Sequence, residues 1–90
     1  MSLHIHKYGG TSVGTAEKIQ NVAKKLVEEK AATGHDLVVV VSAMSGETNR
    51  MTALAQQMQS SPSAQQMDVL LSTGEQVTIS LLCMALEELG

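Results

Sequence analysis

The chain has 90 residues, of which 43% are hydrophobic, and a formal net charge of −3. This length allows one small domain and excludes a second, and the hydrophobic content is far above that of disordered chains. The acidic balance argues against nucleic acid as a partner. Only 17% of the residues are charged, fewer than in most soluble domains. Because the surface therefore has few solubilising groups, we expect the chain to associate, as in a homo-oligomer.

The first predicted elements are a strand and a helix. Residues 3–8 alternate between apolar and polar side chains and run into Gly9, which is typical of a strand that ends there. From about Thr15 apolar residues recur with the helical period, which predicts an amphipathic helix over residues 15–32, and Gly34 tolerates the positive φ of a helix end. The apolar positions of this helix are Ile19, Val22, Ala23 and Leu26.

Residues 37–41, LVVVV, are a continuous apolar run that contains four β-branched valines, typical of a buried strand in a parallel sheet. Strand, helix and strand together predict a βαβ unit, whose crossover is right-handed in nearly all proteins. Further helices are predicted from Met51 to the Ser-Pro cluster at 60–63, over 64–72 and over 74–89. The buried faces expected for them carry Met51, Leu54, Ala55 and Met58, then Met67, Leu70 and Leu71, and finally Ile79, Leu82, Cys83 and Leu86.

The fold class is therefore α/β, with two parallel strands and about four helices. Two strands leave both edges of a sheet unpaired, so the pattern is that of the first part of a larger domain. No apolar run approaches the roughly 20 residues that cross a bilayer, and residues 1–12 lack the apolar core of a secretory signal. The single cysteine, Cys83, fits a reducing compartment. We expect a cytoplasmic protein with no membrane partner.

The stretch KYGGTSVG, residues 7–14, has the composition of a phosphate-binding turn, because backbone N–H groups of a glycine loop that leads into a helix attract anions. Gly9 and Gly14 have the spacing of a P-loop, but Thr15 occupies the position of its lysine. Here the lysine, Lys7, precedes the glycines. The alternative is an ordinary strand-to-helix turn with a solvent-exposed lysine, and the pattern alone leaves both open.

A second polar loop follows the second strand. If the two strands are adjacent and parallel, the loops at Gly9 and Ser42 open on the same sheet edge, where open α/β sheets bind ligands. Ser42, Ser45 and Thr48 offer hydroxyl groups for a small polar ligand. The structural alternative is that Ser45 caps the next helix.

The stretch STGEQ, residues 72–76, satisfies the capping-box pattern twice, as Ser72 with Glu75 and as Thr73 with Gln76. A helix start is therefore favoured over a ligand role for Glu75. His4 and His6 share one side of a strand, but no third metal ligand is evident, so no metal site is predicted.

Three stretches together, KYGGTSVG, VVVVSAMSGETNR and LLSTGEQVTISLLCMAL, closely resemble the amino-terminal part of bacterial aspartokinases, which belong to the amino acid kinase family. The resemblance implies a three-layer α/β/α fold, of which residues 1–90 form an incomplete amino-terminal segment without a regulatory domain. It also implies transfer of the γ-phosphate of ATP, with Mg²⁺, to the side-chain carboxylate of L-aspartate. The product, 4-phospho-L-aspartate, begins lysine, threonine and methionine biosynthesis.

The resemblance also assigns roles to individual residues. Lys7 would be the catalytic residue that contacts the transferring phosphate, and Glu75 would face the ammonium group of aspartate. The phosphate loop would consist of Gly9, Gly10, Thr11 and Ser12, and the aspartate pocket would contain Ser42, Thr48 and Glu75.

The sequence lacks the family's later motifs, so we expect no useful kinase activity from the 90-residue chain alone. One alternative is another amino acid kinase, acting on glutamate, carbamate or a nucleotide. The other is a small non-catalytic module that binds anions or takes part in assembly.

Overall fold

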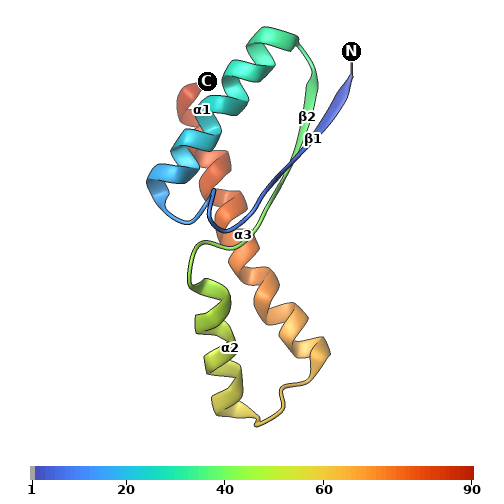
Figure 1. Ribbon diagram of the computed structural model, residues 1–90, viewed down its shortest axis with the longest axis vertical. Helices are drawn as coiled ribbons and strands as arrows, with labels where there is room; N and C mark the ends of the chain where they lie inside the picture. Colours follow the sequence, from blue (N-terminus) through green and yellow to red (C-terminus); the bar gives the residue numbers. More distant parts are fainter. Residues whose placement is uncertain (1) are drawn as a thin grey trace.

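The computed structural model describes residues 2–90, which form two strands and three helices (Figure 1). The expected α/β class is confirmed. The expected number of about four helices is wrong, because the segments predicted over 64–72 and 74–89 form one continuous helix. The elements are β1 (Leu3–Tyr8), α1 (Ala16–Thr33), β2 (Asp36–Val41), α2 (Glu47–Met58) and α3 (Ala64–Leu89).

The two strands pair in parallel along their whole length, from Leu3 opposite Asp36 to Tyr8 opposite Val41. Because side chains alternate along a strand, one face of this sheet presents Tyr8 and Val41 together with Leu37 and Val39, and these contact the hydrophobic core. The opposite face is uncovered in residues 2–90, and its apolar side chains are exposed: Leu3, Ile5, Val38 and Val40.

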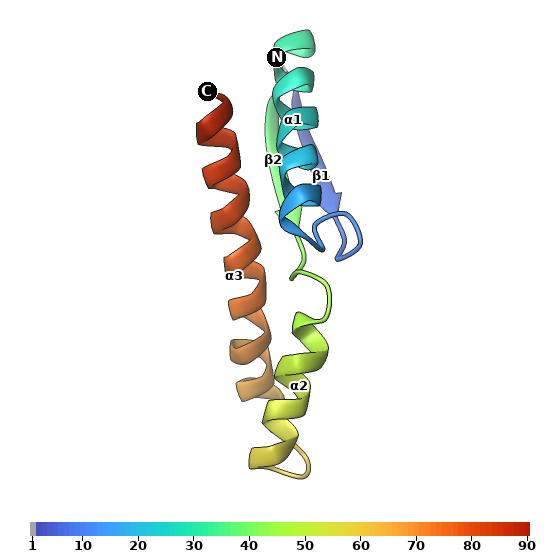
Figure 2. The ribbon, with the colours of Figure 1, turned by 90° about the vertical axis from the view of Figure 1, so that its left-hand side faces the viewer.

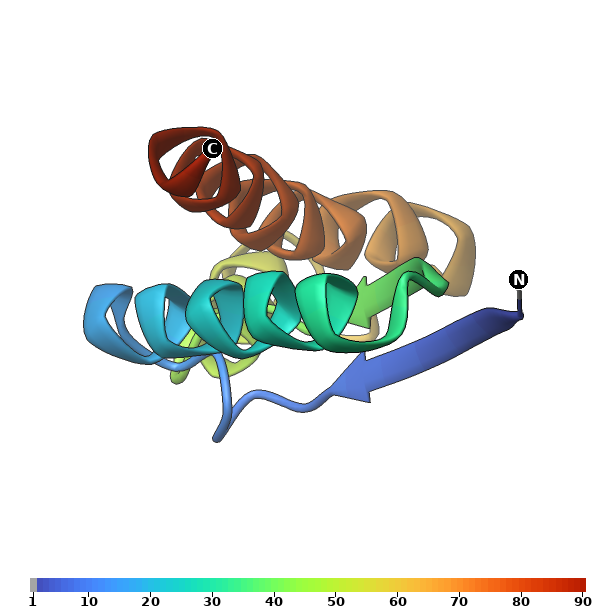
Figure 3. The ribbon, with the colours of Figure 1, turned by 90° about the horizontal axis from the view of Figure 1, so that it is seen from above.

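Helices α1 and α3 both cover the same face of the sheet (Figure 3). Residues 2–90 therefore form two layers, and the three-layer arrangement that the resemblance implies is not seen within them. The molecule is elongated, with extents of 50 × 25 × 18 Å, because α2 and the first part of α3 extend beyond the sheet as an antiparallel pair (Figure 2).

Helix α1 begins and ends at local signals that the sequence contains. Thr15 is its N-cap, and the Oγ1 atom of Thr15 accepts a hydrogen bond of 3.2 Å from the backbone N–H of Lys18. Gly34 ends the helix in the left-handed conformation, with φ of 69°, and its N–H donates to the carbonyl of Lys30. A side chain would strain this backbone, so the expected role of Gly34 is confirmed.

Helix α3 continues through the stretch where two helix starts were predicted. The hydroxyl of Ser72 donates to the carbonyl of Val69 and that of Thr73 to the carbonyl of Leu70, both at 2.7 Å. The hydroxyls are thus used inside the helix and cap nothing. The N-cap is Ser63, whose Oγ accepts from the N–H of Gln66 at 3.4 Å. The capping-box interpretation is therefore wrong.

The core lies between α1, α3 and the covered sheet face, and the four apolar positions predicted for the first helix are all buried in it. Met51 is also buried, but Met58, at the end of α2, is 80% exposed. On α3 the buried residues recur every four positions, at Gly74, Thr78 and Leu82. The buried face of α3 is therefore rotated about the helix axis relative to the predicted apolar stripe. Two members of that stripe, Ile79 and Cys83, are exposed.

Helix α3 is, by length and composition alone, apolar enough to cross a membrane. This corrects the expectation that no segment of sufficient length exists, and the reason is that a break was predicted near Gly74 where the helix is continuous. Leu82 of this helix belongs to the core shared with α1 and β2, but many of its other apolar side chains are exposed: Val69, Val77, Ile79, Leu81, Met84 and Leu89.

Candidate functional site

Both strands end at the same level, so their following loops start side by side. Tyr8 pairs with Val41 at the end of the ladder, and the N–H of Ser42 donates to the carbonyl of Tyr8 at 3.0 Å. The expected meeting of the two loops at the carboxyl edge of the sheet is confirmed. In open α/β sheets this edge is the usual place for a ligand.

The loop after β1, residues 9–15, turns tightly at its start. The N–H of Ser12 donates to the carbonyl of Gly9 at 3.0 Å, while the side chains of Thr11 and Ser12 are exposed. A Cβ atom built on Gly9 meets nothing within 4 Å, so solvent or a ligand has free access to this backbone. Lys7 is exposed as well, and by strand alternation it lies on the uncovered face of the sheet.

The two loops contact each other closely through glycine. The hydroxyl of Ser45 donates to the carbonyl of Gly10 at 3.4 Å, and a Cβ atom on Gly10 would lie 3.4 Å from the carbonyl oxygen of Ala43. Gly14 is buried, and a Cβ atom there would overlap the Ser45 hydroxyl and lie 2.8 Å from the Gly10 carbonyl oxygen. Only a residue without a side chain lets the loops approach this far.

Helix α3 contacts the other side of the second loop, again at a glycine. A Cβ atom on Gly74 would lie 2.9 Å from the Cβ of Ala43 and 3.2 Å from the Cε of Met51. Beside it, the hydroxyl of Thr73 lies 3.9 Å from the sulfur of Met51. The loop of residues 42–46 is therefore enclosed between the glycine loop and α3, with Glu75, which is exposed, one residue beyond this contact.

Replacing Gly74 with Ala is expected to destabilise the chain, because overpacking against Ala43 costs about 1–3 kcal/mol and outweighs the gain of about 1 kcal/mol in helix propensity. In an Ala43→Gly background the obstructing methyl group is gone, so the same substitution is expected to be neutral or stabilising. Urea unfolding followed by circular dichroism measures both effects. Equal stabilisation in the two backgrounds would show that the close approach of α3 to the loop does not exist.

The alternative in which Ser45 caps the helix after this loop is wrong. Gly46, with φ of 81°, is the N-cap of α2 and has no side chain that could cap the helix, and the Ser45 hydroxyl donates to the carbonyl of Gly10 instead. Thr48, in the first turn of α2, is exposed. Glu47 precedes it and accepts two hydrogen bonds from Arg50, from Nε at 3.2 Å and from Nη2 at 2.8 Å.

The hydrogen bonds from Arg50 lower the pKa of the Glu47 carboxyl below its ordinary value. A carboxyl whose pKa is lowered by folding stabilises the fold above its unfolded pKa, and this contribution is lost as pH falls through the folded pKa. Arg50→Gln is therefore expected to raise the pKa of Glu47 toward the ordinary value, as measured by an NMR pH titration of its side-chain carbon. Arg50→Lys, which retains the charge without the two-nitrogen contact, should give an intermediate value, and an unchanged pKa in Arg50→Gln would refute the pairing.

The structure thus brings the glycine loop, the loop of residues 42–46 and α3 near Gly74 into one region. Within residues 2–90, no hydrogen bond or ion pair joins the side chains of the predicted ligand residues to one another. Sequence reasoning missed the contributions of Ala43 and Gly74, and it left Ser45 open between a ligand role and a helix cap. The small size of Ala43 and Gly74 is their only signal in the sequence.

The two histidines of β1 have protein partners. The Nε2 atom of His6 lies 2.6 Å from Oε2 of Glu29 on α1, and the ring of His4 stacks on that of His35 with centroids 4.1 Å apart. In the described part of the chain, no group of three or more His, Cys, Asp or Glu side chains could hold a metal ion.

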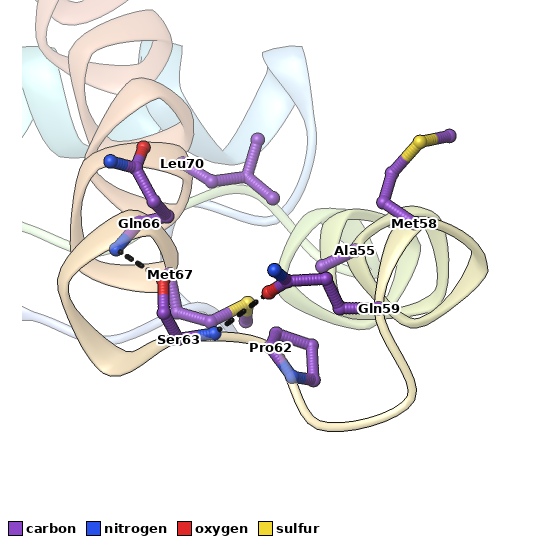
Figure 4. Close-up of a pocket in the computed structure, with 8 residues that line it drawn as sticks. All are labelled: Ala55, Met58, Gln59, Pro62, Ser63, Gln66, Met67 and Leu70. Carbon is purple, nitrogen blue, oxygen red and sulfur yellow. Dashed lines mark hydrogen bonds between the residues drawn. The ribbon is translucent and has the colours of Figure 1, made fainter.

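A separate hollow of about 500 Å³ lies at the far end of the molecule, between the end of α2 and the start of α3 (Figure 4). Its lining carries no charged side chain. Gln59 holds the connecting turn there, because its side-chain oxygen accepts from the N–H of Ser63 at 3.2 Å. None of the predicted site residues lines this hollow, so it is not part of the candidate site.

Comparison with known proteins agrees with this arrangement. The sequence model of the amino acid kinase family matches residues 2–90. The chain is 57% identical over 90 residues to an aspartokinase of Pseudomonas aeruginosa and 56% identical to aspartokinase 2 of Bacillus subtilis, covering all of this chain and 22% of each relative. The crystal structure of an aspartate kinase from Synechocystis matches 98% of this chain and 15% of its own, with a TM-score of 0.90 and 51% identity.

Proposed function

Because the chain belongs to the amino acid kinase family, as a segment similar to aspartokinases over its whole length, we propose that the protein containing it is an ATP:L-aspartate 4-phosphotransferase. In this proposal, the carboxyl edge of the sheet binds the transferring phosphate and part of the aspartate. The observation that carries the proposal is the convergence of the glycine loop, the loop of residues 42–46 and α3. The chain spans about a fifth of its curated relatives' length, so the remaining contacts come from elsewhere.

The glycine loop fits the phosphate part of ATP by the chemistry of its donors. The backbone at Gly9 is open to solvent, and the hydroxyls of Thr11 and Ser12 are exposed beside it. Such backbone N–H groups and hydroxyls bind anionic oxygens. Lys7 adds a positive charge at the end of β1, where it would neutralise charge on the phosphoryl oxygens during transfer.

The described residues fit Mg²⁺ less well, since no acidic cluster lies among them. Mg²⁺ is typically bound through substrate phosphates, waters and one or two carboxylates, and in this proposal the carboxylates lie outside this chain. The ion would neutralise negative charge on the phosphates when bound.

The aspartate pocket is assigned to Ser42, Thr48 and Glu75. Ser42 directly follows β2, Thr48 is in the first turn of α2, and Glu75 follows the contact of Gly74 with Ala43. The carboxylate of Glu75 would attract the ammonium group of aspartate, while the hydroxyls would position its carboxylates. These three roles rest on the resemblance, and all three side chains are exposed and accessible.

The reaction needs little proton transfer from the protein. An aspartate carboxylate, with an ordinary pKa near 4, is already ionised at neutral pH and can attack the γ-phosphorus directly, forming the new P–O bond as the bond to ADP breaks. Catalysis then depends on alignment of the two substrates and on stabilisation of the phosphoryl oxygens. A lysine and a glycine loop are suited to the second task.

A chimera tests this proposal, with residues 1–90 in place of the matching stretch of the Pseudomonas aeruginosa aspartokinase. We expect the chimera to form ADP in an aspartate-dependent manner, at a rate within about tenfold of the parent enzyme, and we expect the 90-residue chain alone to show no useful activity. A folded chimera that is inactive, or one that prefers glutamate or carbamate, would refute the assignment. Turnover by the chain alone at the parent's rate would refute the claim that it is only part of a site.

A further inference from the structure

A hollow of about 240 Å³ opens beside the glycine loop, on the side of α1. Thr11 and Ser12 line it from the loop, Tyr8 from the end of β1, and Lys18, Asn21 and Lys25 from α1. At roughly 30 Å³ per water molecule, this volume has room for a phosphate-sized anion and part of its hydration shell. Figure 2 shows the loop beside the first turns of α1.

The polar side chains that line the hollow are hydrogen-bond donors that are either positively charged or uncharged. Lys18 and Lys25 are two helical turns apart, about 10 Å along the axis, and Asn21 lies between them on the same face. Their long side chains allow both ammonium groups to reach one anion. None of the acidic residues lines the hollow, although the chain has nine of them against six Lys and Arg.

Neither lysine forms an ion pair with another described residue. The ion pairs within residues 2–90 involve Lys30, Arg50 and His6, and Lys18 and Lys25 are not among them. A concave surface that carries charges of a single sign concentrates counter-ions. An otherwise acidic chain therefore has a local positive site next to its phosphate loop.

This hollow is distinct from the position assigned to the transferring phosphate. Lys7 and Gly9 do not line it, and Lys7 lies on the sheet face opposite to α1, whereas Tyr8 lies on the face that α1 covers. Thr11 and Ser12 are shared by both regions. An anion in the hollow would thus contact the loop from its other side.

We propose that this hollow is a second anion site, which binds a phosphate group through Lys18, Lys25, Asn21 and the hydroxyls of Thr11 and Ser12. The ligand class is a free phosphate or the phosphate of a larger molecule, since both present the same oxygens. Binding there would order the loop that also carries Gly9 and Gly10. The proposal does not depend on the identity of the kinase substrate.

The test is a titration of the 90-residue chain with inorganic phosphate, followed by ¹H–¹⁵N NMR. We expect saturable shifts at Thr11, Ser12 and Asn21 that weaken as salt is added. Lys18→Gln combined with Lys25→Gln should lower the affinity by about tenfold or more, because two charge-assisted donors are lost. Lys24→Gln removes a charge from the same helix outside the hollow and should leave the affinity within about twofold.

Equal loss of affinity in Lys24→Gln and in the double variant would overturn the proposal, as would the absence of saturable shifts in the dispersed spectrum of the unsubstituted chain. A second titration, with ADP on the phosphate-saturated chain, identifies the source of the anion. Additional shifts at Gly9 with phosphate retained in the hollow indicate a free anion. Release of the phosphate by ADP indicates that the hollow binds a phosphate of the nucleotide.

Discussion

Lys7→Met in the chimera is expected to lower aspartate-dependent ADP formation by about 100- to 1000-fold, the usual loss when one group that stabilises transition-state charge is removed. The structural reason is the place of Lys7, which is exposed at the end of β1 and directly precedes a glycine turn with open backbone at Gly9. Methionine retains the length of the side chain without its charge. Steady-state kinetics should show the loss in kcat, because the interaction strengthens during transfer.

The matched control for Lys7 is Lys24→Met, which removes an exposed charge on α1 outside both loops. Its activity should stay within about twofold of the unsubstituted chimera. Circular dichroism of both variants establishes that they are folded. A folded Lys7→Met chimera with full kcat would contradict the role assigned to this lysine.

Leu82→Ala is expected to destabilise the chain by about 2–5 kcal/mol, the range for large-to-small substitutions in a core. Leu82 is 5% exposed and is the buried residue through which α3 joins the core formed by α1 and β2. A small domain has only about 5–15 kcal/mol of net stability, so a large share is lost. Urea unfolding of the 90-residue chain measures the change.

Leu89→Ala provides the comparison on the same helix, because Leu89 is 45% exposed and its truncation leaves a smaller cavity. Its effect should be clearly smaller than that of Leu82→Ala. Equal effects of the two substitutions would mean that α3 does not use Leu82 to contact the rest of the chain.

Local sequence signals predicted the βαβ unit well. Alternation in residues 3–8, the apolar period of residues 15–32 and Gly34 are each properties of one segment, and each element formed within one residue of its expected bounds. The extent of α3 was not predictable in this way. The sequence does not distinguish a serine or threonine that caps a helix from one whose hydroxyl donates to a carbonyl inside it, as Ser72 and Thr73 do.

The sequence predicted the two loops of the candidate site but not the contacts between them and α3. The meeting of the loops at Gly9 and Ser42 follows from strand pairing, and the structure confirms it. Ser45 and Gly74 contact residues that are distant in the sequence, so no local sequence pattern predicts these contacts. The ligand roles of Lys7 and Glu75 stay predictions.

The most direct test of the proposed phosphate site is a ¹H–¹⁵N spectrum of the 90-residue chain with and without Mg-ATP. We expect dispersed peaks, with nucleotide-dependent shifts that include residues 7–14 and 42–48, because these loops together form the phosphate side of the proposed site. A dispersed spectrum that does not respond to Mg-ATP, or responds only at the hollow between α2 and α3, would contradict it.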